Sequence, residues 1–165
     1  PLLPVVSLDA IARASGHGGF IAVIADARMG EVYWAAYRGD ERIGAPRVGA
    51  PMQALAAMTA ERGAAEPPGL AAGDGLARHP SIAEALRREG FALRPDVRPG
   101  ARAIAELALR RLAAGERGVD AADAAPVYVR DKVALDAREQ DALRAARDAA
   151  ARSVDAGAAA PDAVR

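Results

Sequence analysis

The sequence has no cysteine and a single lysine, Lys132, and aromatic residues make up 4% of its 165 positions. Without cysteine the chain can form no disulfide, no thiolate nucleophile and no zinc–thiolate site. This absence fits a cytoplasmic protein. No apolar run is long enough to cross a bilayer, so we expect no contact with a membrane.

The charges balance, with 22 Lys and Arg residues against 22 Asp and Glu residues. A net charge of zero argues against a protein whose whole surface binds nucleic-acid phosphates, although a local basic patch remains compatible with it. The 52% hydrophobic and 27% charged shares are typical of a globular protein, and the length fits one domain. The chain starts at Pro1 without a charged segment before an apolar one, so it does not resemble a secretory precursor. We expect a fragment that begins inside a folded protein.

Helical and β patterns alternate along the chain, which predicts an α/β or α+β fold. The five residues DARMG (26–30) predict a hairpin turn, and a hairpin favours a mixed sheet. In the strand after that turn, alternation places Val32, Trp34 and Ala36 on one face, and we expect Trp34 to be buried. Helices are predicted at 4–14, 51–63, 81–90 and 101–114, and strands at 20–25, 31–37, 42–48, 69–73, 91–93 and 127–129.

Local signals predict how several helices begin and end. Ser7 is the expected N-cap of the first helix, and Gly16 its stop. Ser81 and Glu84 have the spacing of a capping box. In the helix at 101–114 the apolar stripe predicted to face the core consists of Ile104, Leu107, Ala108 and Leu112.

Motifs for catalysis are scarce. The two histidines, His17 and His79, are far apart, and neither belongs to an HExxH pair, so both are interpreted as loop residues. The sequence has no GxSxG elbow, and no glycine-rich phosphate loop precedes Lys132. GDG at 73–75 is interpreted as an ordinary turn. We therefore expect no catalytic residue, no cofactor and no metal.

Two polar clusters are the candidate sites. The first is the DARMGE turn with Asp26, Arg28 and Glu31, followed by Tyr33 and Trp34. It is either an ordinary turn, in which Asp26 bonds backbone amides and Arg28 pairs with Glu31, or a recognition corner for an anion with an aromatic wall. The second cluster is PVYVRDK, which carries Tyr128, Arg130 and Lys132. It is either a contact site or an edge strand protected by charge.

These clusters carry a resemblance to a known family. IADARMGEVYWAAYR (24–38) resembles the signature of the bacterial TsaB family, also called YeaZ. APVYVRDKVA (125–134) resembles the closing motif of that family, and LPVVSLDAIA (3–12) its helix at the domain junction. The Asp-Thr-Ser/Thr strand and the GPGSFTGLR-like segment of the N-terminal actin-like half do not occur.

The resemblance implies an ASKHA (ribonuclease H-like, actin-like ATPase) subdomain, a mixed sheet with a β-hairpin flanked by helices. It implies a C-terminal subdomain at 1–134, in which 1–19 form a junction helix and a Gly-rich joint. Residues 135–165 are then an Ala-rich helical extension with a frayed tail.

The resemblance further implies a non-catalytic accessory or scaffold subunit that supports TsaD in threonylcarbamoylation of the adenosine next to the anticodon of tRNAs. The implied partners are TsaD-like and TsaE-like proteins and a second TsaB copy, bound through the family's N-terminal half, with tRNA reached only through the complex. The site residues would contact partners or support the fold. Two alternatives stay open: an M22-type, glycoprotease-like metallopeptidase, and a nucleotide- or RNA-binding module that uses Arg28 and Arg130.

Overall fold

The computed structural model describes residues 1–63, 67 and 69–130. The chain divides into two compact units, 1–129 and 130–165. Among the described residues, every helix and strand belongs to the first unit. The predicted boundary at 134, the extension at 135–165 and Lys132 lie outside the described residues.

A five-stranded mixed sheet forms the centre of the fold, with the strand order β3-β2-β1-β4-β5. β1 pairs antiparallel with β2 and parallel with β4, so it is the strand where the antiparallel and parallel halves of the sheet meet. The strands are β1 (Phe20–Asp26), β2 (Val32–Arg38), β3 (Glu41–Gly49), β4 (Leu70–Ala72) and β5 (Ala92–Arg94). The predicted mixed sheet with its hairpin is confirmed.

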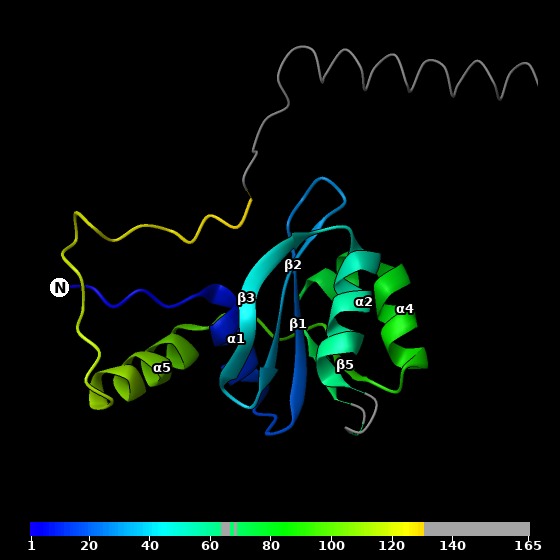
Figure 1. Cartoon of the computed structure of the whole chain (residues 1–165), viewed down its shortest axis with the longest axis horizontal. Coiled ribbons are helices and arrows are strands. Elements are labelled where there is room, and N and C mark those ends of the chain that lie inside the picture. The colour runs from blue at the N-terminus through cyan, green and yellow to red at the C-terminus, as the bar shows by residue number, and fades with distance from the viewer. Residues whose placement is uncertain (64–66, 68, 131–165) are drawn as a thin grey trace, which may run out of the picture. The chain divides into compact units, whose positions relative to one another are not determined.

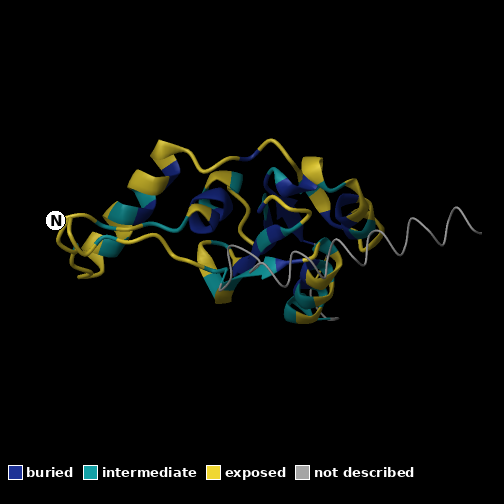
Figure 2. Cartoon of the chain, turned by 90° about the horizontal axis from the view of Figure 1, so that it is seen from above, coloured by how far each residue is buried: buried dark blue, intermediate teal, exposed yellow. Residues whose placement is uncertain are grey.

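Helices cover both faces of this sheet, α2 and α4 on one side and α1 on the other, with α5 packed against α1 (Figure 1). In Figure 2 the dark blue buried residues gather toward the middle of the folded part. A short helix, α3, which the sequence patterns did not predict, follows β4. The helices are α1 (Ser7–Ser15), α2 (Pro51–Arg62), α3 (Gly75–Arg78), α4 (Pro80–Arg88) and α5 (Ala101–Ala113).

The face covered by α2 and α4 has a large apolar core. The predicted alternation along β2 is confirmed, because Val32, Trp34 and Ala36 all belong to this core. Trp34 is 5% exposed, as expected, and the Arg47 guanidinium lies 5.7 Å from its ring centroid. Phe20 and Phe91 pack edge to face with their centroids 6.1 Å apart. Burial of these aromatic rings holds this face together.

The opposite face combines an apolar core with a buried charge. Ile21, Val23 and Ala35 from the sheet pack against Leu8 and Ile11 of α1. At its centre, Asp9 accepts a hydrogen bond from the Tyr37 hydroxyl at 2.9 Å, and Asp9 is only 6% exposed. Burial, followed by the charge and hydrogen bond of Asp9, raises the pKa of Tyr37 above its ordinary value. Tyr37 therefore stays protonated and donates.

Close packing of β4 against β1 explains the GDG segment. A Cβ added to Gly73 would lie 2.2 Å from the carbonyl oxygen of Ile24, and Gly73 has a φ of +118°. A Cβ on Gly75 would meet the Ile24 side chain at 2.7 Å. Glycine is thus required at both positions, where the chain turns from β4 into α3.

Two predicted helix caps are wrong. Ser7 is the first helical residue of α1, Val6 is the N-cap, and no side chain caps this helix. The capping box of Ser81 and Glu84 does not form, because α4 already begins at Pro80. Proline is well suited to the first helical position, where its missing N–H has no partner to lose. The predicted stop at Gly16 is confirmed, since Gly16 adopts the left-handed conformation.

Two further predictions about packing are corrected. Ala103 and Leu107 are the buried residues of α5, whereas Ile104 and Leu112 are 37% and 51% exposed. The predicted stripe was right at Leu107 and wrong at Ile104 and Leu112, because Ala103 is the residue buried beside Leu107. Residues 127–129 adopt no strand, so the edge-strand interpretation of the second cluster is wrong.

Candidate functional site

The turn between β1 and β2 closes by backbone hydrogen bonds and presents an exposed tip. Ala27 N–H donates to the Glu31 carbonyl at 3.0 Å, and Glu31 N–H donates to the Arg28 carbonyl at 2.9 Å. Arg28 and Met29 have φ values of +62° and +54°, in the left-handed region that non-glycine residues rarely adopt. Their side chains face solvent, and Met29 is 75% exposed. Backbone strain of this kind occurs most often at functional sites.

Asp26 anchors the turn, as one of the two interpretations predicted. Its Oδ1 accepts the Arg28 N–H at 3.2 Å, and its Oδ2 lies 3.6 Å from Arg28 Nη1. The Asp26 N–H donates to Asp74 Oδ1 at 3.1 Å. His79 Nε2 lies 3.3 Å from Asp26 Oδ1, so this histidine supports the turn rather than lying free in a loop. Its role was missed because nothing in the sequence links positions so far apart.

The pKa of Asp26 is held below its ordinary value. Burial, the largest single influence, acts to raise it. The hydrogen bonds from Arg28 N–H and His79, together with the charges of these two residues, outweigh the burial. Asp26 is therefore an ionised structural anchor. His17, the other histidine, is exposed in its loop, as expected.

An apolar groove with a cavity volume of about 370 Å³ lies beside this turn. It brings together residues of the three motifs that were recognised separately in the sequence: 3–12, 24–38 and 125–134. Pro46 of β3 is the one lining residue outside them. The lining residues are Pro4, Val5, Val6, Ser7, Leu8, Ala25, Tyr33, Pro46, Ala125, Pro126, Val127 and Val129. A groove of this size with so few polar groups is suited to an apolar surface or ligand.

The predicted site residues divide around this groove. Tyr33 lines it, whereas Trp34 points to the opposite face of the sheet and is buried there. The expected aromatic wall therefore consists of Tyr33 alone. Tyr128 is 78% exposed and its neighbours Val127 and Val129 line the groove. Arg130 lies in the second unit of the chain.

Neither a cluster of metal-ligating side chains nor a membrane-spanning helix occurs among the described residues. In this part of the chain, no three His, Cys, Asp or Glu side chains gather closely enough to hold a metal ion. None of its helices has both the length and the apolar character that a bilayer crossing requires.

Two solved structures from Pseudomonas aeruginosa resemble this chain. One is described as an uncharacterized protein with similarity to peptidase YeaZ, and the other as YeaZ. The first matches at 30% identity and a TM-score of 0.62, over 79% of this chain and 59% of its own. The second matches at 30% identity and a TM-score of 0.54, over 78% and 59%. The chain thus spans about three fifths of each structure, and the fold is the actin-like, ribonuclease H-like fold. No protein-family model and no curated protein match the chain.

Proposed function

The chain is a member of the YeaZ/TsaB-like family, and from this premise we propose that it is an accessory subunit without chemistry of its own. In this proposal it supports a TsaD-like enzyme in the threonylcarbamoylation of the adenosine next to the anticodon of tRNAs. TsaE-like proteins and a second TsaB copy are the further proposed partners. In this proposal four of the candidate residues contact a partner or support the fold, namely Asp26, Arg28, Glu31 and Tyr128.

The apolar groove is the observation that supports this proposal. Residues from the three motifs of the family resemblance line one continuous groove. Among the described residues, its polar side chains are Ser7 and Tyr33. The lining offers neither of them a side chain that could act as a general base. An apolar groove beside an exposed, strained turn fits a surface for protein contact better than a reaction site.

Complementation tests the proposal. Cells depleted of TsaB would receive a chimera that joins this chain to the part of Pseudomonas aeruginosa YeaZ that it does not match. We expect threonylcarbamoyladenosine to return, measured by mass spectrometry of digested tRNA. A chimera that is soluble and folded but leaves the tRNA unmodified would contradict the accessory role.

Two substitutions of equal character separate the groove from the rest of the surface. Val127 lines the groove and is 59% exposed, while Leu109 of α5 lies outside it and is 66% exposed. In the chimera, Val127→Asp should lower the level of modified adenosine, because it places a charge in an apolar contact. Leu109→Asp should leave that level unchanged. Equal effects would remove the groove from the proposal.

A peptidase is the second candidate, because one of the similar structures is described as a protein with similarity to a peptidase. A peptidase of the M22 type predicts uptake of zinc and loss of activity on chelation. Metal analysis of the purified protein, with a peptide-cleavage assay before and after chelation, decides between the two. Zinc uptake with chelator-sensitive cleavage would favour the peptidase.

A further inference from the structure

A second pocket, of about 250 Å³, lies on the other side of the molecule from α2 and α4. α1, the end of the β2–β3 hairpin and α5 surround it. Three guanidinium groups and two carboxylates form most of its wall. The lining residues are Asp9, Asp40, Arg42, Leu107, Arg110 and Arg111.

The buried carboxylate of this wall accepts three hydrogen bonds. Asp9 Oδ1 accepts from Arg42 Nη1 at 2.6 Å in addition to the Tyr37 hydroxyl. Asp9 Oδ2 accepts from Arg111 Nη2 at 2.9 Å. Arg111 Nη1 donates to the carbonyl of Pro4 at 3.0 Å. Asp9 therefore fixes two arginines at the pocket by charge-assisted hydrogen bonds.

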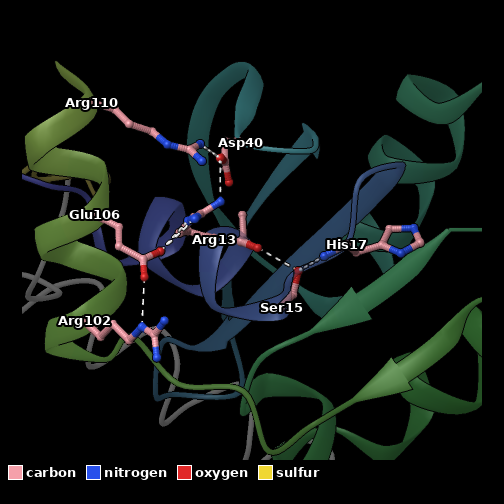
Figure 3. Close-up of polar contacts among 8 residues, drawn as sticks. Arg13, Ser15, His17, Asp40, Arg102, Glu106 and Arg110 are labelled. Carbon is pink, nitrogen blue, oxygen red and sulfur yellow. Dashed lines mark hydrogen bonds and ion pairs between the residues drawn. The ribbon is translucent and has the colours of Figure 1, made fainter. Parts of the chain in front are cut away.

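The second carboxylate is shared as well. Asp40 Oδ2 accepts from Arg13 Nη1 at 3.2 Å and from Arg110 Nη1, as Figure 3 shows. Arg13 also donates to Glu106 at 2.8 Å, and Glu106 accepts from Arg102 at 2.9 Å. These contacts hold the guanidinium groups of α1 and α5 side by side at the rim of the pocket.

The cluster carries an excess of positive charge. Among the described residues it joins five arginines, namely Arg13, Arg42, Arg102, Arg110 and Arg111, to the three acids Asp9, Asp40 and Glu106. Glu116, 3.9 Å from Arg111 Nε, reduces the excess from two charges to one. The lining of the hollow itself, with three arginines and two aspartates, also carries one net positive charge.

Two of the arginines that line this hollow keep unused guanidinium donors. Within the described contacts, Arg42 uses Nη1 for Asp9 and Nε for the carbonyl of Gly44 at 3.2 Å, which leaves its Nη2. Arg110 uses Nη1 for Asp40, which leaves its Nε and Nη2. A guanidinium fork binds phosphate oxygens in pairs, and a partly enclosed pocket strengthens such bonds.

We propose that this pocket binds a phosphate group, held by Arg42 and Arg110 while Asp9 and Asp40 keep both side chains in place. The site is separate from the apolar groove and does not depend on the accessory role. The cavity has room for the phosphate and for part of the molecule that carries it.

A titration of the 165-residue chain followed by two-dimensional NMR tests the site. The probes are inorganic phosphate, adenosine 5′-monophosphate and a short single-stranded RNA, each at low ionic strength, with sodium chloride as the ionic control. Saturable shifts at α1, α5 and the β2–β3 turn are expected. Equal affinity for the first two probes would identify free phosphate as the ligand, and tighter binding of AMP or RNA a phosphate ester.

Three variants test the direction in which the affinity for the probe should change. Arg110→Gln should raise the Kd about tenfold, since it removes a charge-assisted hydrogen bond; Arg110 is 55% exposed, so the fold is unaffected. Asp40→Asn should lower the Kd, because it removes a negative charge from the wall while its amide oxygen can still accept from Arg110. Arg88→Gln, on α4 and 74% exposed, is the control and should change nothing. No saturable shift with any probe, or an Arg110→Gln protein that binds like the wild type, would overturn the proposal.

Discussion

Each face of the sheet has one well-anchored aspartate, but one lies at the edge of its face and the other in the middle. On the α2/α4 face the carboxylate of Asp26 lies at the end of β1, beside His79, and the middle is apolar. On the α1/α5 face Asp9 lies in the middle, buried beneath Tyr37, Arg42 and Arg111. The stability of the first face therefore depends on filled volume, and that of the second on whether each polar group keeps its partner.

The largest expected effect is on the apolar face. Trp34→Ala should lower the free energy of unfolding by about 3–5 kcal/mol, because it leaves a cavity against Met58 and the helices. Urea unfolding followed by far-UV circular dichroism measures it, since Trp34 is the only tryptophan and its fluorescence is lost.

A matched variant separates volume from polarity at this position. Trp34 Nε1 is buried and has no hydrogen-bond partner among the described residues. Trp34→Phe retains most of the ring and removes this N–H, so its cost should stay below about 1.5 kcal/mol. A loss as large as that of Trp34→Ala would show that the indole N–H has a partner after all.

The next largest loss of stability is expected on the α1/α5 face, where the buried polar groups lie. Asp9→Ala leaves a buried hydroxyl and two guanidinium groups without their acceptor, and we expect a loss of about 2–3 kcal/mol. The value lies below that of a fully buried pair because Arg42 and Arg111 are about 30% exposed and can turn to water. Tyr37→Phe, which removes one donor and leaves Asp9 two others, should cost about half as much. Thermal unfolding of the three proteins gives the order, and a costlier Tyr37→Phe would contradict it.

A smaller effect, present near neutral pH and lost in acid, is expected at the rim of the apolar face. The pKa of Asp26 lies below its ordinary value of 3.8, so ionised Asp26 stabilises the fold above that pH. This stability is lost as the pH falls through the pKa of the folded state. Asp26→Asn should therefore be less stable than wild type at pH 6, and the difference should shrink below about pH 4. Unfolding midpoints across this range measure it, and a pH-independent difference would contradict the assignment.

The smallest change in stability is expected at an exposed ion pair, which serves as a reference for the other variants. Arg88 and Glu84 form an exposed i,i+4 pair on α4, with side chains 74% and 60% exposed. Glu84→Gln should change the free energy of unfolding by less than about 0.5 kcal/mol, because water screens both charges. A larger loss in urea unfolding would mean that α4 depends on this pair.

Much of the fold follows from local sequence patterns. The alternation along β2 predicted which face Trp34 occupies, and the DARMG segment predicted the hairpin. The errors came where tertiary packing decides. Pro80 starts α4 ahead of the expected capping box, and α5 buries Ala103 instead of Ile104 because a small side chain lets it approach α1.

The candidate sites were predictable only in part. Asp26 and Tyr33 were found because they are adjacent to a recognisable turn. His79, Asp74 and Asp9 were not, because their partners are distant in sequence and only the sheet brings them together. Arg42 and Arg110 were hidden for the same reason, among arginines that look alike along the chain.

The position of β1 at the junction of the sheet sets an order of folding. β1, β2 and β3 follow one another along the chain and pair antiparallel, so they can assemble from local contacts soon after synthesis. The parallel pair of β1 and β4 must wait until residue 70 has been made and α2 has crossed over. Until α2 has been made, the Trp34 face of the nascent hairpin lacks the helix that covers it, and at this stage a ribosome-bound chain most needs protection from aggregation.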